Sequence, residues 1–293
     1  MPNAEANGIN IEYDEFGERS GRPLLLIMGL GAQMIFWRDD FCAQLAERGH
    51  RVIRFDNRDV GKSSKLDHLS VPDPTAAVEA ASLGQPVQAP YSLFDMAADA
   101  VGLLDALHID KAHIVGASMG GMIAQAMAIR HPSRVRSLTS IMSTTGNPDL
   151  PRAKPEAMAA LLSPQPDTRK ESIERAIFIF RTIGSTGFSY DEADVRAVAA
   201  LSYDRGISRD GAARQLVAIL ASGSRREALK SVNVPALVIH GSEDPLVPAE
   251  AARDTAAAIL GAELMIIEGM GHDLPRMVWP RIIDAISTLT ARA

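Results

Sequence analysis

The fold of this chain is decided by the stretch His113-Ile114-Val115-Gly116-Ala117-Ser118-Met119-Gly120. Its last five residues match G-x-S-x-G, and they lie between an apolar run that predicts a strand over 112–115 and a segment that predicts a helix over 119–130. A sharp turn at this place lifts a serine oxygen clear of the sheet, and glycines on either side leave room for it. Ser118 is therefore predicted to be a nucleophile. The alternative is a glycine-rich turn with an incidental serine.

Strands and helices alternate on both sides of this turn. Short apolar runs predict strands over residues 24–28, 51–55, 112–115, 135–142, 235–240 and 263–267. An apolar stripe at three- and four-residue steps predicts a helix over 93–107. The four-residue spacing of Trp37, Phe41 and Leu45 predicts another helix over 36–48. This order indicates an α/β protein, with a mostly parallel sheet and helices on both faces.

The pattern changes between residues 146 and 227. Prolines punctuate its first part, its apolar segments are helical in character, and no clear strand follows before residue 235. We interpret residues 146–227 as a helical insertion, and residues 1–145 and 228–293 as one core, which the total length of 293 residues allows. Residues 64–92 form a second long connection, which is either functional or loose.

Composition excludes several classes of partner. The 36 acidic and 30 basic residues give a net charge of -6, which repels phosphate backbones, so we expect no nucleic-acid partner. The single cysteine, Cys42, cannot form an intrachain disulfide, and neither a metal site nor a cofactor motif is indicated. No signal segment opens the chain and no apolar run approaches about 18 residues. We expect a soluble, cytoplasmic protein without membrane contact, in a homo-oligomer or alone.

A serine hydroxyl needs a base, because it is a weak nucleophile at neutral pH. In proteins with this turn the chain order is serine, acid, histidine, which leaves His131, His240 and His272 as bases. His131 ends the nucleophile helix, and His240 ends a strand. His272 follows the strand at 263–267 in a glycine-rich loop, so we predict that it is the base.

The carboxylate that orients the base is predicted to be Asp244. It directly follows the strand at 235–240 and precedes His272 by 28 residues. Asp149, after the preceding strand, is the second candidate. Glu243 is expected to point elsewhere, and Asp273 lies too close to His272 in sequence to orient it from behind.

Two backbone amides are predicted to bind the oxyanion that forms during acyl transfer. The residue after the nucleophile, Met119, supplies one. Leu30, in the loop Met28-Gly29-Leu30-Gly31 after the strand at 24–28, supplies the other.

Five motifs stand in one order along the chain: the Met28-Gly29-Leu30-Gly31 loop, the turn from Asp56 to Ser63, the serine turn, the Asp244 loop and the His272 loop. In these motifs the chain resembles the α/β-hydrolases over nearly its whole length. Met28 stands where that family usually has histidine. In this methionine and in the segments 53–56 and 269–272, the chain is similar to the aclacinomycin methylesterase branch. The resemblance implies the α/β-hydrolase fold and a lid over the site, which fits the insertion at 146–227.

Together these residues predict a hydrolase that cleaves a hydrophobic small-molecule carboxylic ester through an acyl-enzyme. The same triad could cleave a carbon-carbon bond, a thioester or a lactone, or make peracids. The resemblance disfavours epoxide hydrolysis and dehalogenation, because members of the family with those activities have aspartate where Ser118 stands. A receptor that keeps the triad and binds a ligand without turnover is the alternative from another class.

Overall fold

The computed structural model, which describes residues 1–71 and 73–293, contains one sheet of eight strands in the order β1-β2-β4-β3-β5-β6-β7-β8. The strands are β1 (Asn3–Ala6), β2 (Ile9–Phe16), β3 (Arg22–Ile27), β4 (His50–Phe55), β5 (Ala112–Ala117), β6 (Val135–Ile141), β7 (Ala236–Gly241) and β8 (Glu263–Ile267). Neighbours from β4 to β8 are parallel, whereas β2 pairs antiparallel with β1 and β4. The predicted α/β class with a mostly parallel sheet is confirmed.

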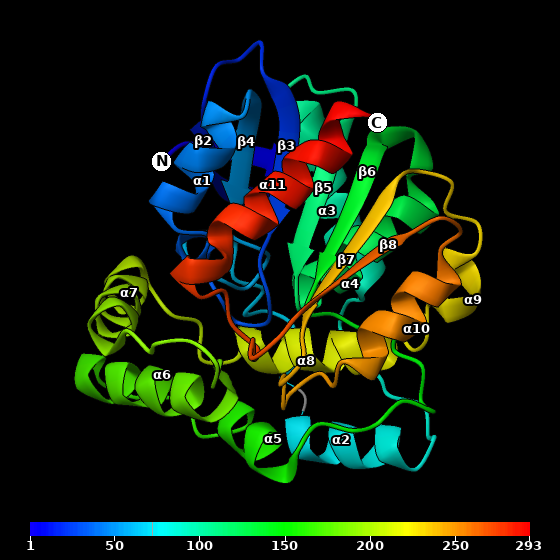
Figure 1. Cartoon of the computed structure of the whole chain (residues 1–293). Coiled ribbons are helices and arrows are strands. Elements are labelled where there is room, and N and C mark those ends of the chain that lie inside the picture. The colour runs from blue at the N-terminus through cyan, green and yellow to red at the C-terminus, as the bar shows by residue number, and fades with distance from the viewer. Residues whose placement is uncertain (72) are drawn as a thin grey trace.

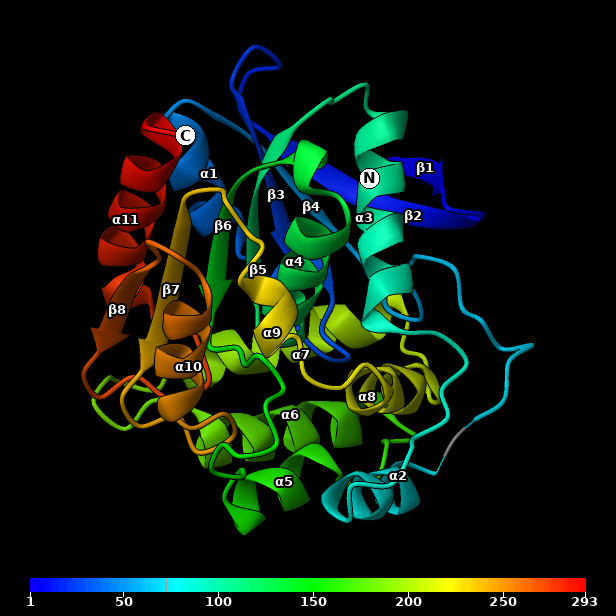
Figure 2. The ribbon, with the colours of Figure 1, turned by 90° about the vertical axis from the view of Figure 1, so that its right-hand side faces the viewer.

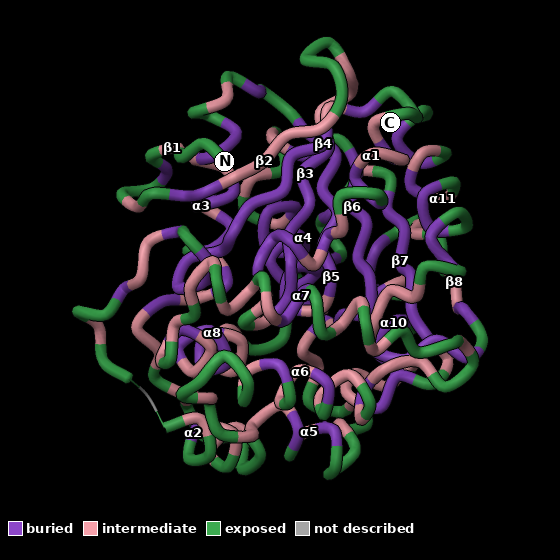
Figure 3. The backbone as a smooth tube through the Cα atoms, turned by 90° about the vertical axis from the view of Figure 1, so that its left-hand side faces the viewer, coloured by how far each residue is buried: buried purple, intermediate pink, exposed green. Residues whose placement is uncertain are grey.

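The central strands read as continuous apolar runs because both faces of the sheet are covered. Every residue of β5 and β7 is buried, as expected for a parallel sheet between two helix layers. Figure 3 shows buried residues running along these strands, while exposed residues lie mainly on the outer turns and helices. The carboxyl ends of β5 and β7 therefore emerge from a rigid support.

Two layers of helices enclose the sheet. The helices of these layers are α1 (Asp39–Glu47), α3 (Leu93–Ala106), α4 (Met119–Arg130), α10 (Glu250–Ala258) and α11 (Trp279–Ala291). Figure 2 shows α1 and α11 on one side of the sheet and α3 with α4 on the other. Each side has its own apolar cluster against the strands.

The predicted helix at 36–48 begins later than expected. Trp37 follows a short 3-10 turn, η1 (Met34–Phe36), and α1 starts at Asp39. The spacing misled because Trp37 does contact Phe41, with ring centroids 5.5 Å apart, although it lies outside the helix. An aromatic residue in the turn before a helix can thus pack against the apolar face of that helix.

The sequence analysis missed the antiparallel hairpin of β1 and β2. Its turn is Asn7-Gly8, and both residues have positive φ, 51° and 78°. Asn-Gly is the preferred pair for such a two-residue turn, because asparagine and glycine tolerate the left-handed region. This dipeptide was the available signal.

The segment between β6 and β7 forms helices and contains no strand among its residues, all of which are described. They are α5 (Pro155–Leu161), α6 (Arg169–Ile183), α7 (Glu192–Arg205), α8 (Gly211–Ala221) and α9 (Arg226–Leu229). Figure 1 shows α5, α6 and α8 across the end of the sheet to which the strand arrows point. The division of the chain into a core and a lid stays a prediction.

The connection at 64–92 is partly helical. Its helix α2 (Pro74–Ser82) is preceded by Asp73, whose carboxylate accepts hydrogen bonds from the backbone N–H groups of Thr75 and Ala76, and it packs against α8. Pro72, which falls within this predicted connection, lies outside the described residues. None of the helices in the described parts of the chain combines the length and apolar character needed to cross a membrane.

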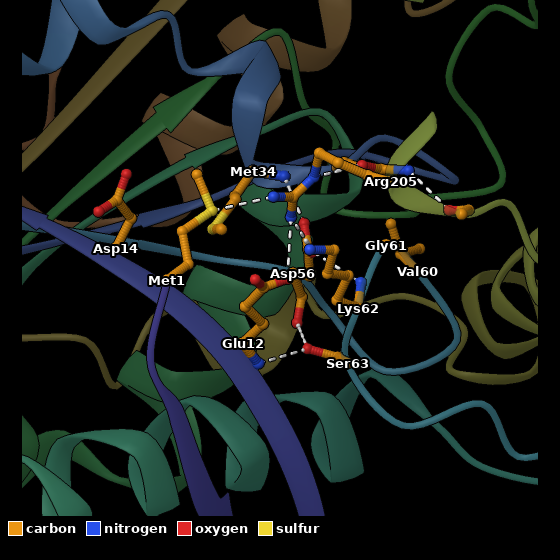
Figure 4. A network of polar contacts seen from close by, with 12 residues as sticks. Met1, Glu12, Asp14, Met34, Asp56, Val60, Gly61, Lys62, Ser63 and Arg205 are labelled. Atoms are coloured by element: carbon orange, nitrogen blue, oxygen red, sulfur yellow. Dashed lines mark hydrogen bonds and ion pairs between the residues drawn. The ribbon is translucent and has the colours of Figure 1, made fainter. Parts of the chain in front are cut away.

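Buried ion pairs bind the helical segment to the sheet. Arg205, at the end of α7, contacts the carboxylates of Asp56 at 2.5 Å and Glu12 at 3.1 Å, and all three side chains are buried (Figure 4). Arg214 on α8 makes a two-pronged contact with Asp59, at 2.9 and 2.7 Å. Both acidic partners at 56 and 59 belong to the turn after β4, so this turn is one attachment point of the helical segment.

Candidate active site

Ser118 occupies a strained turn between β5 and α4. Its φ of 55° and ψ of -120° place an L-residue in a sparsely populated region. A Cβ atom at Gly116 would lie 2.0 Å from the carbonyl oxygen of Gly120, and one at Gly120 would lie 2.0 Å from that of Ile27. Both glycines of the motif are therefore required by close backbone packing.

The three predicted side chains form one hydrogen-bonded chain. His272 Nε2 lies 2.9 Å from Ser118 Oγ, and His272 Nδ1 lies 2.7 Å from Asp244 Oδ2. Ser118 follows β5, Asp244 follows β7, and His272 follows β8, so three strand ends bring together residues up to 154 positions apart. Asp244 and His272 are buried, whereas Ser118 is half-buried and can be reached from outside.

Asp244 is held as a carboxylate. Its Oδ1 accepts hydrogen bonds from the backbone N–H groups of Leu246 and Val247, at 2.9 and 2.8 Å. Burial alone would raise the pKa of Asp244, but the neighbouring His272 and His240 outweigh it, so the pKa lies well below its ordinary value. An ionised Asp244 fixes the tautomer of His272 with its proton on Nδ1 and leaves Nε2 free to accept one.

The Gly29 loop, residues 28–31, lies directly against Ser118. A Cβ atom at Gly29 would stand 3.2 Å from the Cβ of Ser118. Among the described residues, the backbone N–H groups of Leu30 and Met119 have no hydrogen-bond acceptor. The carbonyl of Met28 accepts from Asn57 Nδ2 at 3.0 Å, a hydrogen bond that fixes the start of the loop.

This constellation lies where the strand order reverses. The chain enters β4 on one side of β3 and returns to β5 on the other side, and ligand sites in open α/β sheets lie outside the strand ends at such a point. Residues 22–275 match the family described as alpha/beta hydrolase fold. The chain belongs to the alpha/beta hydrolase fold family.

The relatives of this hydrolase agree with that assignment. It is 30% identical to rhodomycin D methylesterase DnrP of Streptomyces peucetius, an alignment that covers 97% of this chain and 96% of the relative. This relative is consistent with the similarity to the aclacinomycin methylesterase branch. Together, the family and its relatives support a hydrolase activity in general.

Two solved structures have the same fold. Est816, described as an N-acyl homoserine lactone degrading enzyme, is 26% identical with a TM-score of 0.70, and the match covers 100% of both chains. A meta-cleavage product hydrolase from Pseudomonas fluorescens IP01 is 24% identical with a TM-score of 0.76, and the match covers 100% of this chain and 98% of the other.

The other candidate residues of this alpha/beta hydrolase do not take the place of His272 beside Ser118. Asp149 and Glu243 are exposed. His240 places its Nε2 2.8 Å from the carbonyl of Val247 and 3.4 Å from Asp244, so it lies beside the predicted acid. His131 is the residue after the last turn of α4.

Asp273 points from the His272 loop, residues 269–275, to the helical segment. Its Oδ1 accepts hydrogen bonds from the backbone N–H of Ser185, at 3.0 Å, and from the Ser185 hydroxyl. Ser185 Oγ in turn accepts from the N–H of Gly271 at 2.9 Å, and the N–H of His272 donates to the carbonyl of Ile183 at 2.7 Å. The end of α6 therefore holds the loop that carries the predicted base.

Sequence reasoning also missed Gln215 on α8, whose side chain contacts the Gly29 loop. Neither Ser185 nor Gln215 belongs to a motif, and both stand in a segment without a local signal for such contacts. Within residues 1–71 and 73–293, no group of three or more His, Cys, Asp and Glu side chains is arranged to hold a metal ion.

Proposed function

We propose that this chain is a carboxylic ester hydrolase that uses Ser118, His272 and Asp244 as a catalytic triad. One observation carries the proposal: Ser118 Oγ, His272 and Asp244 form a continuous hydrogen-bonded chain at three strand ends, with distances of 2.9 and 2.7 Å. The methylesterase relative from Streptomyces peucetius supports an ester as the bond that is cleaved.

In the first half of the reaction, Ser118 Oγ attacks the acyl carbon and His272 Nε2 takes the serine proton. The carbonyl oxygen becomes an oxyanion, which accepts hydrogen bonds from the N–H groups of Leu30 and Met119. Preorganised donors of this kind are each worth about 10² to 10³ in rate. The C–O bond to the alcohol then breaks, and His272 returns the proton to the leaving oxygen.

In the second half, water attacks the acyl-enzyme. His272 Nε2 takes a proton from this water, a second oxyanion forms at the same two amides, and the bond to Ser118 Oγ breaks. The serine recovers its proton from His272, and the acid leaves. Asp244 remains ionised throughout and stabilises the charged imidazolium.

The substrate that we propose is a hydrophobic small-molecule ester. The helical segment between β6 and β7 lies over the strand ends that carry the triad (Figure 1), and we propose that it is a lid. Its helices α5 and α6 carry the apolar runs 158–162 and 176–180. A lid of this composition favours an apolar substrate and helps to exclude water from the site.

Ester hydrolysis by wild-type protein and by Ser118→Ala tests the proposal. The panel consists of p-nitrophenyl esters of graded chain length together with aryl and methyl esters. We expect turnover of at least one class, and a loss on the order of 10⁶-fold in kcat for Ser118→Ala, as for removal of a serine nucleophile in general. Ser231→Ala, at an exposed helix end, serves as the control. Wild-type turnover by Ser118→Ala would rule out the mechanism.

A lactone is the second candidate substrate, because Est816 is described as a lactone degrading enzyme. A lactone is a cyclic ester, so the same attack by Ser118 opens it. Lactones and thioesters therefore belong in the panel, and a kcat/KM for lactones far above that for open esters would favour this candidate. A ligand that raises Tm and is never consumed would instead indicate a receptor.

A further inference from the structure

Gln215 is a fully buried amide that joins the lid to the Gly29 loop. Its Oε1 accepts the hydrogen bond of the Gly31 N–H at 2.8 Å, and its Nε2 donates to the carbonyl of Arg58 at 2.8 Å. One side chain of α8 thus bridges two backbone segments of the core. Both polar ends of the amide are satisfied, so a precise orientation is imposed on it.

The bridge is anchored on a rigid point. The guanidinium of Arg58 makes two contacts of 2.6 Å with the carboxylate of Asp99, and both side chains are buried. The side of α8 that carries Gln215 also packs closely on the loop, because a Cβ atom at Gly31 would lie 3.4 Å from the Cβ of Ala212. Positions 212 and 215 are one helix turn apart and face the same way.

The loop needs such support, because its own residues give it little stiffness. Gly29 and Gly31 flank Leu30, Gly31 has a φ of 65°, and glycine has the greatest conformational freedom of any residue. Asn57 holds the Met28 carbonyl and so fixes the first peptide plane of the loop. A second fixed plane is needed to orient the peptide between them.

Gln215 supplies that second plane. By binding the Gly31 N–H it fixes the peptide that joins Leu30 to Gly31, since a peptide unit is planar. It also occupies the Gly31 donor, while the neighbouring N–H of Leu30 has no acceptor among the described residues. Because the peptide planes on both sides are fixed, the peptide between them, which carries the Leu30 N–H, is held in one orientation.

We propose that Gln215 is a positioning residue that aims the Leu30 N–H at the oxyanion. The inference deepens the proposed ester hydrolysis and rests on it. Gln215 does not touch the substrate in this mechanism, and it acts through Leu30 alone. Its effect is therefore confined to states in which the oxyanion exists.

Gln215→Met tests the proposal, since methionine preserves size and removes both hydrogen bonds. We expect kcat to fall about 10- to 100-fold, less than or equal to the loss of a whole oxyanion donor, while KM changes by about threefold or less. The affinity for a trifluoromethyl ketone, whose serine adduct carries an oxyanion, should fall by the same factor as kcat/KM. If Gln215 had only a structural role, the folded fraction of the variant would keep the wild-type kcat/KM and the wild-type ketone affinity.

Gln125→Met is the matched control. Gln125 is also a fully buried glutamine; it accepts a hydrogen bond from Arg225 at 3.2 Å and donates one to Ser140 at 3.4 Å, so its hydrogen-bond partners lie outside the Gly29 loop. We expect it to lose stability and to keep kcat and ketone affinity. If Gln215→Met does not fold, Gln215→Asn takes its place, because its amide is one methylene too short to span Gly31 and Arg58.

Two outcomes would overturn the inference. One is a folded Gln215 variant with wild-type kcat and ketone affinity. The other is a fall in kcat with no fall in ketone affinity. In both cases a dead Ser118→Ala would show that the ester hydrolase proposal survives, whereas an active Ser118→Ala would remove the proposed function itself.

Discussion

Asp244 and Glu243 are neighbours in sequence with opposite environments. Asp244 is buried with its carboxylate on His272, whereas Glu243 is exposed. Asp244→Asn keeps the size of the side chain but replaces a carboxylate oxygen with an amide, which favours the wrong tautomer of His272. We expect kcat to fall about 10⁴-fold, as for the corresponding change in serine proteases.

Steady-state kinetics on the best ester of the panel checks this prediction, with circular dichroism to confirm folding. Glu243→Gln changes the same charge one residue away and should leave kcat within about twofold. If Asp244→Asn retained most of its activity, Asp244 would not be the orienting acid.

Ser118, Asp244 and His272 could be predicted from the sequence, because each follows a predicted strand and they stand in the chain order of proteins with this serine turn. The structure brings these three side chains within hydrogen-bonding distance of one another. Gln215 and Ser185 could not be predicted, because their partners are backbone groups of distant loops. A polar residue on a helix gives no sign of which distant N–H it will meet.

Among the elements, the end of α6 and the His272 loop depend on each other through Ser185. Ser185→Ala leaves the N–H of Gly271 without its acceptor and takes the hydroxyl from the carboxylate of Asp273. Burial raises the pKa of Asp273, and the hydrogen bonds of Ser185 oppose this rise. We expect a loss of about 2 kcal/mol in the free energy of unfolding, because the broken bonds include one to a carboxylate.

Urea unfolding followed by fluorescence measures this loss. Ser82→Ala is the control, since Ser82 is exposed and donates to a carbonyl within its own helix, so we expect a change of about 0.5 kcal/mol or less. Equal stabilities for the two variants would contradict a supporting role for Ser185.

Element prediction succeeded where one periodicity dominates. The apolar stripe of α3 has a clear helical spacing, and the helix also carries a capping box at Ser92 and Asp95. The start of α1 was wrong, because Trp37 contacts the helix face from outside it. The β1–β2 hairpin was missed, since its strands mix polar and apolar residues and only the Asn7-Gly8 turn marks it.

For the molecule as a whole, Arg205 is a buried link between the helical segment and the core, through its ion pairs with Asp56 and Glu12. Arg205→Met would leave Asp56 and Glu12 as buried carboxylates without their cation, although the Asp56 carboxylate keeps the hydrogen bonds from the backbone N–H groups of Met34 and Lys62 (Figure 4). Removing one partner of a buried ion pair costs about 3 to 5 kcal/mol. We expect a loss of that size in the free energy of unfolding.

Chemical denaturation of Arg205→Met beside Arg169→Met checks this. Arg169 pairs with Asp204 on the same helical segment, but both side chains are about half exposed, at 51% and 52%, so its loss should cost far less than the loss of Arg205. Similar losses for the two variants would show that the buried network contributes no more than a surface pair.

At this scale the sequence predicted an α/β sheet interrupted by a helical stretch, because strand runs stop after residue 142 and resume near 235. It could not predict how that stretch is attached. Arg205 pairs with residues 149 and 193 positions away, and charged residues of a helix are usually solvated. Long-range pairs of this kind depend on the packed fold, which no local pattern records.

The positive φ of Ser118, the proposed nucleophile, destabilises the folded state. A non-glycine residue in such a region costs about 1 to 3 kcal/mol, a sizeable part of a total stability of about 5 to 15 kcal/mol. Glycine at position 118 would relieve this cost, so selection for stability alone would discard the serine. Under the mechanism proposed here, a descendant freed from catalysis would drift toward glycine at this turn, and serine there marks a chain still selected for turnover.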